Sequence, residues 1–230
     1  MNITLLTSTP KPESVVAAAA KLCYSDSNIG EIFKQGNSEC HRIITKVLSL
    51  GHFSVLEHIS ITFGIEGVSR ALSHQFVRHR LASYSQQSQR YVKFEGERSG
   101  FIDIPESFKK TEELKNQWDK VMYNAREEYL IAIEDGVPPE DARLLLPNAA
   151  ETKLVMTMNA RELHHFFSLR CCNRAQWEIR AMAKKMLLLC RSVSPLLFKD
   201  AGPTCLTGKC PEGSMSCGKS AEVRRELGRV

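Results

Sequence analysis

The stretch that most constrains the fold is residues 107–135, which carry apolar side chains at helical spacing along their length. The stripe is formed by Leu114, Trp118, Val121, Met122, Ala125, Tyr129 and Ile133. Gly136 follows, with Pro138 and Pro139 behind it, and such residues end helices. The sequence therefore predicts one long amphipathic helix. Its length suits packing against other helices, including helices of another subunit.

Alternating apolar residues predict three strands, at residues 2–6, 59–65 and 152–158. Helical patterns cover residues 12–24, 38–50, 69–78, 139–147 and 182–195. We expect an α+β fold, in which a mainly antiparallel sheet is flanked by long helices. The length of 230 residues fits one domain, residues 1–200, and a Cys-containing tail, residues 201–230.

A basic segment, residues 67–94, contains no Asp or Glu. Its basic residues are Arg70, Arg78, Arg80, Arg90 and Lys93, with His74 and His79 beside them. Folded surfaces usually mix charges of both signs, so this segment creates a positive potential that favours an anion. Serines and glutamines within residues 83–90, which we expect to form a loop, could read a sugar or a base. A solvated basic loop is the simpler alternative, but the density of these residues favours a nucleotide site.

The net charge of +5 favours anionic small molecules or weak nucleic-acid binding, without separating the two. The first nine residues lack the features of a secretory signal, and no stretch approaches the roughly 20 apolar residues of a membrane span. We therefore expect a cytoplasmic protein without a membrane partner. Five scattered cysteines are then most simply reduced thiols.

Three separated motifs resemble those of the flavin-dependent thymidylate synthases. The first is Arg78-His79-Arg80 followed by Ser88 and Arg90, and the second is Arg170 with the string Ala-Gln-Trp-Glu-Ile at residues 175–179. The third is the His-x-Ser-x-x-Glu-His element at residues 52–58. The resemblance covers about residues 37–197. The chain departs from the family pattern at Gln86, His165 and Arg174, where some members carry Glu, Asn and His.

The resemblance implies reductive methylation of dUMP to dTMP. Methylenetetrahydrofolate would be the carbon donor, FAD the redox carrier and NADPH the reductant. It also implies a homotetramer with active sites shared between subunits, and no nucleic-acid partner. The bound molecules are all anionic, which agrees with the many arginines of this chain.

Site residues are carried over from the resemblance. Those expected at dUMP are Gln75, Phe76, Val77, Arg78, Gln86, Gln87, Ser88, Gln89, Arg90, Arg143 and Arg170. Those expected at FAD are His52, Ser54, Arg78, His79, Arg80, Gln86, Asn159, Arg161 and His165. Arg170 is the expected catalytic residue, because a cation against the pyrimidine would stabilise developing negative charge.

Several of these residues have ordinary structural alternatives. The histidines and Glu57 within residues 52–58 could be satisfied turn residues or weak metal ligands. Asn159, three residues before Glu162, could cap a helix while also serving the flavin. Arg143 could pair with Glu140 on the surface. Ser88 has no acid–base pair at usable spacing to make it a nucleophile.

The tail carries Cys205, Cys210 and Cys217 within thirteen residues, set among Gly and Pro. Structural zinc takes four ligands, and these thiols supply three. The fourth could be Cys190, a histidine or another subunit. A structural zinc and a flexible reduced tail both remain open.

Two rival functions use the same residues. A nucleic-acid-binding module would use the basic segment and the cysteine tail, and it would give a colourless protein with steeply salt-dependent binding. A nucleotide-binding regulator would bind flavin or dUMP without oxidising NADPH.

Overall fold

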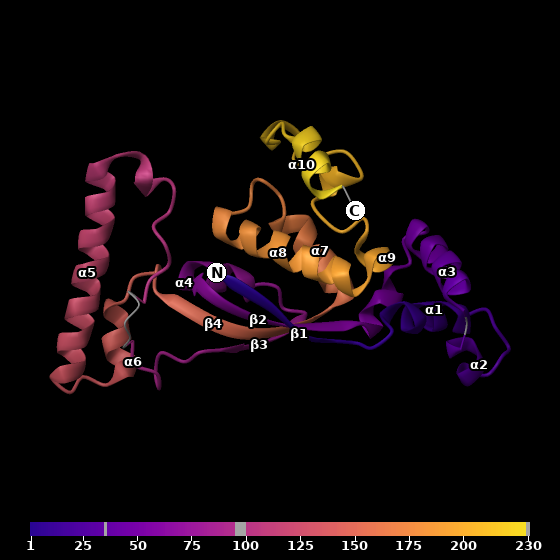
Figure 1. The fold of residues 1–230 in the computed structure, drawn as a ribbon, viewed down its shortest axis with the longest axis horizontal. Coiled ribbons are helices and arrows are strands. Elements are labelled where there is room, and N and C mark those ends of the chain that lie inside the picture. The colour runs from indigo at the N-terminus through magenta and orange to yellow at the C-terminus, as the bar shows by residue number, and fades with distance from the viewer. Residues whose placement is uncertain (35, 95–99, 229–230) are drawn as a thin grey trace. The chain divides into compact units, whose positions relative to one another are not determined.

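The computed structural model describes residues 1–34, 36–94 and 100–228. Most of the polar linker expected at residues 95–100 and the last two residues of the tail lie outside this part of the chain. The strands are β1 (Asn2–Ser8), β2 (Ser60–Ser69), β3 (Ala82–Gln86) and β4 (Glu151–Asn159). They form one antiparallel sheet in the order β1-β2-β4-β3 (Figure 1). The predicted α+β class is confirmed.

Ten α-helices accompany the sheet in the described residues. They are α1 (Pro12–Leu22), α2 (Ile29–Phe33), α3 (Asn37–Ser49), α4 (Arg70–Phe76), α5 (Glu112–Glu134), α6 (Pro139–Ala142), α7 (Ala160–Arg170), α8 (Trp177–Val193), α9 (Pro195–Phe198) and α10 (Ser220–Leu227). Short 3-10 turns are η1 (Phe53–His58), η2 (Phe108–Lys110), η3 (Arg143–Leu145), η4 (Thr204–Leu206) and η5 (Gly213–Met215). Among the described residues, no helix has the length and apolar character to cross a membrane.

The chain divides into two compact units. Unit 1 contains residues 1–2, 65–78 and 85–155, and unit 2 contains residues 3–64, 79–84 and 156–230. Strands β2 and β4 contribute residues to both. The Arg-His-Arg motif is divided as well, because Arg78 belongs to unit 1 whereas His79 and Arg80 belong to unit 2.

Unit 2 holds the larger core. The alternating residues of β2 and β4 bury one face, and α7 and α8 add a second apolar layer. Fully or almost fully buried side chains include Ile61, Phe63, Met156, Met158, Phe166, Phe167, Met186 and Leu187. Helix α7 packs against α8 and η1, and α8 packs against α9. The core thus fixes α7, on which several expected site residues lie.

Unit 1 is organised around α5. This helix begins later than predicted because Thr111 caps it by accepting a hydrogen bond from the Leu114 amide at 3.3 Å. It ends as predicted at a glycine, Gly136, whose φ of 87° suits a residue without Cβ. Tyr129 is the one α5 residue classed as buried, and its hydroxyl accepts from the Phe94 amide at 3.0 Å. Much of the predicted apolar stripe is therefore solvent-accessible in a single chain.

The expectation of a loop over residues 83–90 is wrong at its start, because residues 82–86 form β3. The strand is polar, and it lies at an edge of the sheet. Edge strands pair through backbone groups and do not need an apolar side-chain pattern. Hydrophobic alternation therefore gave no indication of it. The pattern also missed the short helices α2 and α10.

Candidate active site

Two arginines expected at the nucleotide meet at Glu140 in unit 1. The Arg90 Nε donates to the Glu140 carboxylate, with 2.8 Å between Nε and Oε2. The Arg143 Nε donates to the Glu140 backbone carbonyl at 2.9 Å. The predicted surface partner of Arg143 is thus its neighbour through the backbone, while the carboxylate pairs with Arg90. Both arginines keep other N–H groups for an anion.

A third arginine in unit 1, Arg70, was not assigned a role from the sequence. Its terminal nitrogen donates to the Gln87 carbonyl at 3.4 Å, and its Nε is buried without a hydrogen-bond partner among the described residues. Burial, and then the charge of Arg143, lower the pKa of the Arg70 guanidinium. A buried donor without a partner costs free energy. An anion bound here would relieve this cost and the repulsion between the two arginines. The sequence signal that could have pointed to Arg70 is its position in the basic segment, residues 67–94, which contains no Asp or Glu.

The residues that follow β3 line a cavity of about 230 Å³ in unit 1. Three expected nucleotide residues, Gln87, Ser88 and Gln89, lie on its wall. Charged side chains also line it, three of them cationic and one acidic: Lys93, Arg126, Lys153 and Glu151. Gln86 is turned to the Thr152 hydroxyl, to which its Nε2 donates at 3.1 Å. The cavity thus combines neutral hydrogen-bonding groups with positive charge.

The residues expected just before this cavity are split between core and surface. The Phe76 side chain is fully buried in unit 1, and Gln75 donates to the Ala71 carbonyl at 3.3 Å. Val77 and Arg78 are exposed. Ser88 accepts a hydrogen bond from the Arg90 amide at 3.1 Å, which is a turn contact. Val77 and Arg78 are thus the members of this group that reach solvent.

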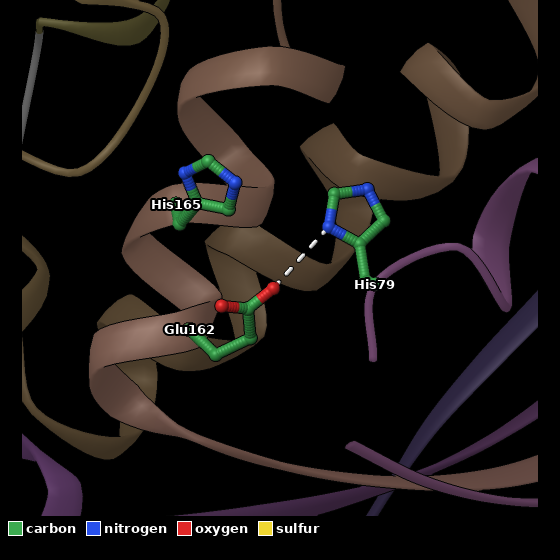
Figure 2. A group of neighbouring side chains, drawn as sticks. All are labelled: His79, Glu162 and His165. Atoms are coloured by element: carbon green, nitrogen blue, oxygen red, sulfur yellow. Dashed lines mark hydrogen bonds and ion pairs between the residues drawn. The ribbon is translucent and has the colours of Figure 1, made fainter. Parts of the chain in front are cut away.

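A hydrogen-bonded chain of three side chains lies in unit 2. The Arg170 Nε donates to the His79 Nε2 at 3.1 Å. The His79 Nδ1 lies 3.4 Å from the Glu162 Oε1 (Figure 2). Arginine nitrogens can only donate, so the His79 Nε2 must accept. The proton of a neutral His79 is then on Nδ1, where it points to the carboxylate. Glu162 thus stabilises the His79 tautomer whose Nε2 accepts the hydrogen bond from Arg170.

The electrostatics agree with a neutral His79. Burial, and then the charges of Arg170 and His165, lower the pKa of His79 to about 4. Burial also raises the pKa of Glu162 and lowers that of Arg170. In the sequence Glu162 is recognisable only as part of a helix cap, so its contact with His79 was not predicted. A second missed contact is the Tyr84 hydroxyl, which donates to the His79 carbonyl at 3.0 Å.

His165 completes a cluster with His79 and Glu162, in which one ligand atom from each lies within 4.8 Å of the others (Figure 2). Two histidines and one carboxylate are a set that zinc or iron(II) accepts. The Arg170 guanidinium, however, already occupies the His79 Nε2 and places a positive charge beside the cluster. A positive charge beside these residues disfavours a metal cation there.

The remaining residues expected at the flavin also belong to unit 2. Asn159 caps α7, because its Oδ1 accepts from the Glu162 amide at 2.8 Å, as the sequence predicted. Arg161 pairs with Glu57 of η1, which brings the segments around residues 52–58 and 159–165 together. His52, Ser54 and Arg80 are exposed. Exposed cations and donors beside a helix N-terminus fit an anionic dinucleotide.

The thiol that directly follows Arg170 in the sequence, that of Cys171, is buried. Burial raises the pKa of the Cys171 thiol to about 12. A protonated, buried thiol is a poor nucleophile. Arg174 lies away from this chemistry, because it donates to the Met215 carbonyl in the tail.

Comparison with known proteins gives one family. A family model described as thymidylate synthase complementing protein matches residues 4–196. A flavin-dependent thymidylate synthase of Geobacter sulfurreducens is 58% identical over 227 residues, which cover 98% of this chain and 97% of the relative. A flavin-dependent thymidylate synthase of Clostridium tetani is 46% identical over 248 residues, covering 98% and 96%. One from Pyrococcus horikoshii is 46% identical over 222 residues, covering 92% and 90%.

A solved structure has the same fold. It is a UMP/dUMP methylase, PolB from Streptomyces cacaoi, bound with 5-Br dUMP. The TM-score is 0.74 at 22% sequence identity, and the match covers 86% of this chain and 93% of that one. At this identity the likeness establishes the fold.

Proposed function

Because this chain belongs to the flavin-dependent thymidylate synthases, we propose that it converts dUMP to dTMP by reductive methylation. The observation that carries the proposal is the 58% identity to a flavin-dependent thymidylate synthase along 98% of the chain. The co-substrates in the proposal are methylenetetrahydrofolate as carbon donor and NADPH as reductant. The cofactor is FAD, and bound flavin supplies the hydride chemistry.

The nucleotide phosphate is assigned to the arginines of unit 1. Arg90 and Arg143 are held by Glu140, so their orientation is set before an anion arrives. Arg70 offers a buried donor without a partner among the described residues. The cavity lined by Gln87, Ser88 and Gln89 adds neutral groups for the sugar. Gln75, Arg78 and Gln86 remain proposed contacts of dUMP, as does the backbone of Phe76 and Val77.

Arg170 is proposed to lie against the pyrimidine. Its Nε is engaged by His79, and this contact orients the plane of the guanidinium. The terminal nitrogens can then donate toward the edge of the ring on which negative charge develops. His79 cannot compete as an acid at neutral pH, because its pKa is lowered to about 4. Of the three hydrogen-bonded side chains, Arg170, His79 and Glu162, only Arg170 therefore supplies positive charge at neutral pH.

The flavin is assigned to residues of unit 2, together with Arg78 and Gln86. Asn159, Arg161 and His165 lie on or beside α7, and His52 and Ser54 lie at η1. Arg161 and Arg80 supply positive charge for the phosphates. His79, which is buried, acts through its contact with Arg170.

The assembly in the proposal is a homotetramer whose subunits share active sites. The support in this chain is α5, on which Val121 and Ile131 are about half exposed although the helix is amphipathic. Light scattering coupled to gel filtration measures the mass of the assembly and so the number of subunits in it. We also propose that residues 1–200 carry the catalytic domain and that residues 201–230 are an appendage.

The test is a spectrum followed by a turnover assay. The purified protein should be yellow, and it should form dTMP only when dUMP, methylenetetrahydrofolate and NADPH are all present. A colourless protein with salt-dependent oligonucleotide binding would support the nucleic-acid module. A yellow protein that binds dUMP without oxidising NADPH would support the regulator.

A further inference from the structure

A groove of about 420 Å³ lies between α1 and α3 in unit 2. The two helices pack against each other, and residues from both form its walls (Figure 1). Its volume is within the roughly 300–1,000 Å³ of small-molecule sites. His52, which follows the end of α3, also lines it. The groove is therefore continuous with the segment at residues 52–58 that is assigned to the flavin.

The backbone of His52 is tied to the last turn of α3. Gly51 has a φ of 77°, in the left-handed region, which turns the chain back toward the helix. The His52 amide then donates to the Val47 carbonyl at 3.0 Å. A co-substrate that reacts beside the flavin has to be held close to it. The part of such a molecule that extends past His52 would enter this groove.

Apolar side chains form part of the wall beside His52. Ile43, Val47 and Leu50 recur on one face of α3, and Tyr24, just after α1, lines the groove from the other helix. The exposed fraction is 60% for Leu50 and 84% for Tyr24, so much of this apolar surface is open to solvent. An aromatic ring lying on it would remove it from water.

The charged side chains of the groove are three cations and one acid, namely Lys21, Arg42, Lys46 and Glu39. Glu39 holds Arg42 through both carboxylate oxygens, at 3.0 Å from Nε and 2.8 Å from a terminal nitrogen. This bidentate pair is neutral as a whole, so Arg42 is left out of the ligand site. Three cations against one acid still give the wall a net positive charge, which favours an anionic ligand.

The two lysines lie at different distances from His52. Lys46 is four residues before Leu50, the C-cap of α3, which is about 6 Å along the helix axis. Lys21 lies beside Glu39, with 3.8 Å between Nζ and Oε1. Glu39 is seven residues before Lys46, about 10 Å farther from the end of the helix. A chain that enters at His52 therefore meets Lys46 first and Lys21 second.

We propose that this groove binds the p-aminobenzoyl-glutamate tail of methylenetetrahydrofolate, and the inference rests on that molecule being the carbon donor of the proposed function. The aromatic ring of the tail covers Val47 and Leu50. The carboxylates of the first glutamate pair with Lys46, and those of further glutamates pair with Lys21. The tail thus matches the groove both in its order of aromatic and acidic groups and in its charge.

The test compares folates with one and with three glutamates as carbon donors for dTMP formation by the full chain. Wild-type protein should have the lower KM for the triglutamate. Lys46→Gln should raise KM for both folates by roughly two- to fivefold, the loss expected for one exposed ion pair. Lys21→Gln should raise KM for the triglutamate only. The matched control is Lys34→Gln, which changes an exposed lysine after α2 that does not line the groove.

Salt gives a second readout. The preference of the wild-type protein for the triglutamate should weaken as salt is added, because exposed ion pairs are screened. Equal KM values for the two folates in the wild-type protein, with dTMP still formed, would overturn the inference and leave the proposed function standing. A second copy of the chain seated on the groove would also overturn it, and in that case Lys46→Gln would change the mass of the assembly and leave both KM values unchanged.

Binding can be measured without turnover. Calorimetric titration of the two folates into the protein as purified should show the same order of affinities and the same effects of the two lysine variants. A protein that forms no dTMP but binds the folates in this order would contradict the proposed function and support the groove. Failure to bind either folate, or affinities that neither lysine variant changes, would overturn the groove as the folate site.

Discussion

The Arg170 Nε donates to the His79 Nε2 at 3.1 Å, and this contact sets the orientation of the expected catalytic arginine. The histidine can accept only while its proton is on Nδ1, where it faces Glu162. One buried carboxylate thus controls, through a neutral ring, where a guanidinium points.

Replacing Arg170 by Ala should lower kcat by about 10²–10³-fold, because a donor aimed at developing charge is lost. The rate of dTMP formation measures this, with flavin content and dUMP affinity measured alongside. Arg42→Ala is the matched control, since Arg42 is an exposed arginine that pairs with Glu39 on α3. Near-normal turnover in the Arg170 variant would remove the catalytic role assigned to it.

Replacing Glu162 by Gln should lower kcat by roughly tenfold, because His79 loses its hydrogen bond to a carboxylate. The Gln side chain can both donate and accept, so it no longer fixes the His79 tautomer that accepts from Arg170. Glu162 is a positioning residue, so its effect should pass through Arg170. The measurement is a double-mutant cycle. In the Arg170→Ala background, Glu162→Gln should cost little more. An equal cost in both backgrounds would show a merely structural role.

Stability should fall as pH falls from about 6.5 to about 4, because the pKa of His79 is lowered to about 4. In that window the unfolded chain binds a proton at this histidine and the folded chain does not, so acidification favours unfolding. The loss is at most about 3 kcal/mol for such a shift. The raised pKa of Glu162 acts in the opposite direction. Urea unfolding across this range, compared with His79→Gln, isolates the histidine, and equal slopes would contradict the prediction.

Replacing Arg90 by Ala should raise KM for dUMP by roughly 10–100-fold, because a charge-assisted contact to the phosphate is lost. Glu140→Gln removes the carboxylate that pairs with Arg90 and orients it, but it keeps the guanidinium. This variant should therefore change KM for dUMP less than Arg90→Ala does. Initial rates at varied dUMP concentration give both values. If Arg90→Ala leaves KM unchanged, the phosphate lies elsewhere.

The sequence predicted the elements whose side chains follow a period. The strands β2 and β4 and the helix α5 were found because their apolar residues recur at spacings of two or of three to four. The edge strand β3 was missed, since its pairing is made by backbone groups. Helix boundaries moved where a cap decides them, as at Thr111.

The residues of the candidate site likewise fall into those that the sequence predicted and those that it did not. Motif residues such as Arg90 and Arg170 could be named from the sequence, because their order and spacing carry the resemblance. Their partners could not be named. Glu140 lies 50 residues from Arg90 along the chain and Glu162 lies 83 residues from His79, and only folding brings each pair into contact.

Arg191 has a practical consequence for anyone who shortens this protein. Within the described residues, the buried Arg191 of α8 donates to the carbonyls of Phe198, Lys199, Ala201 and Leu227, all of which lie beyond residue 196, where the family match ends. Trimming the chain to the family boundary would remove these carbonyl oxygens and uncover the guanidinium, so we expect the shortened protein to be less stable. Shortened versions of the protein should therefore keep the chain at least through Leu227.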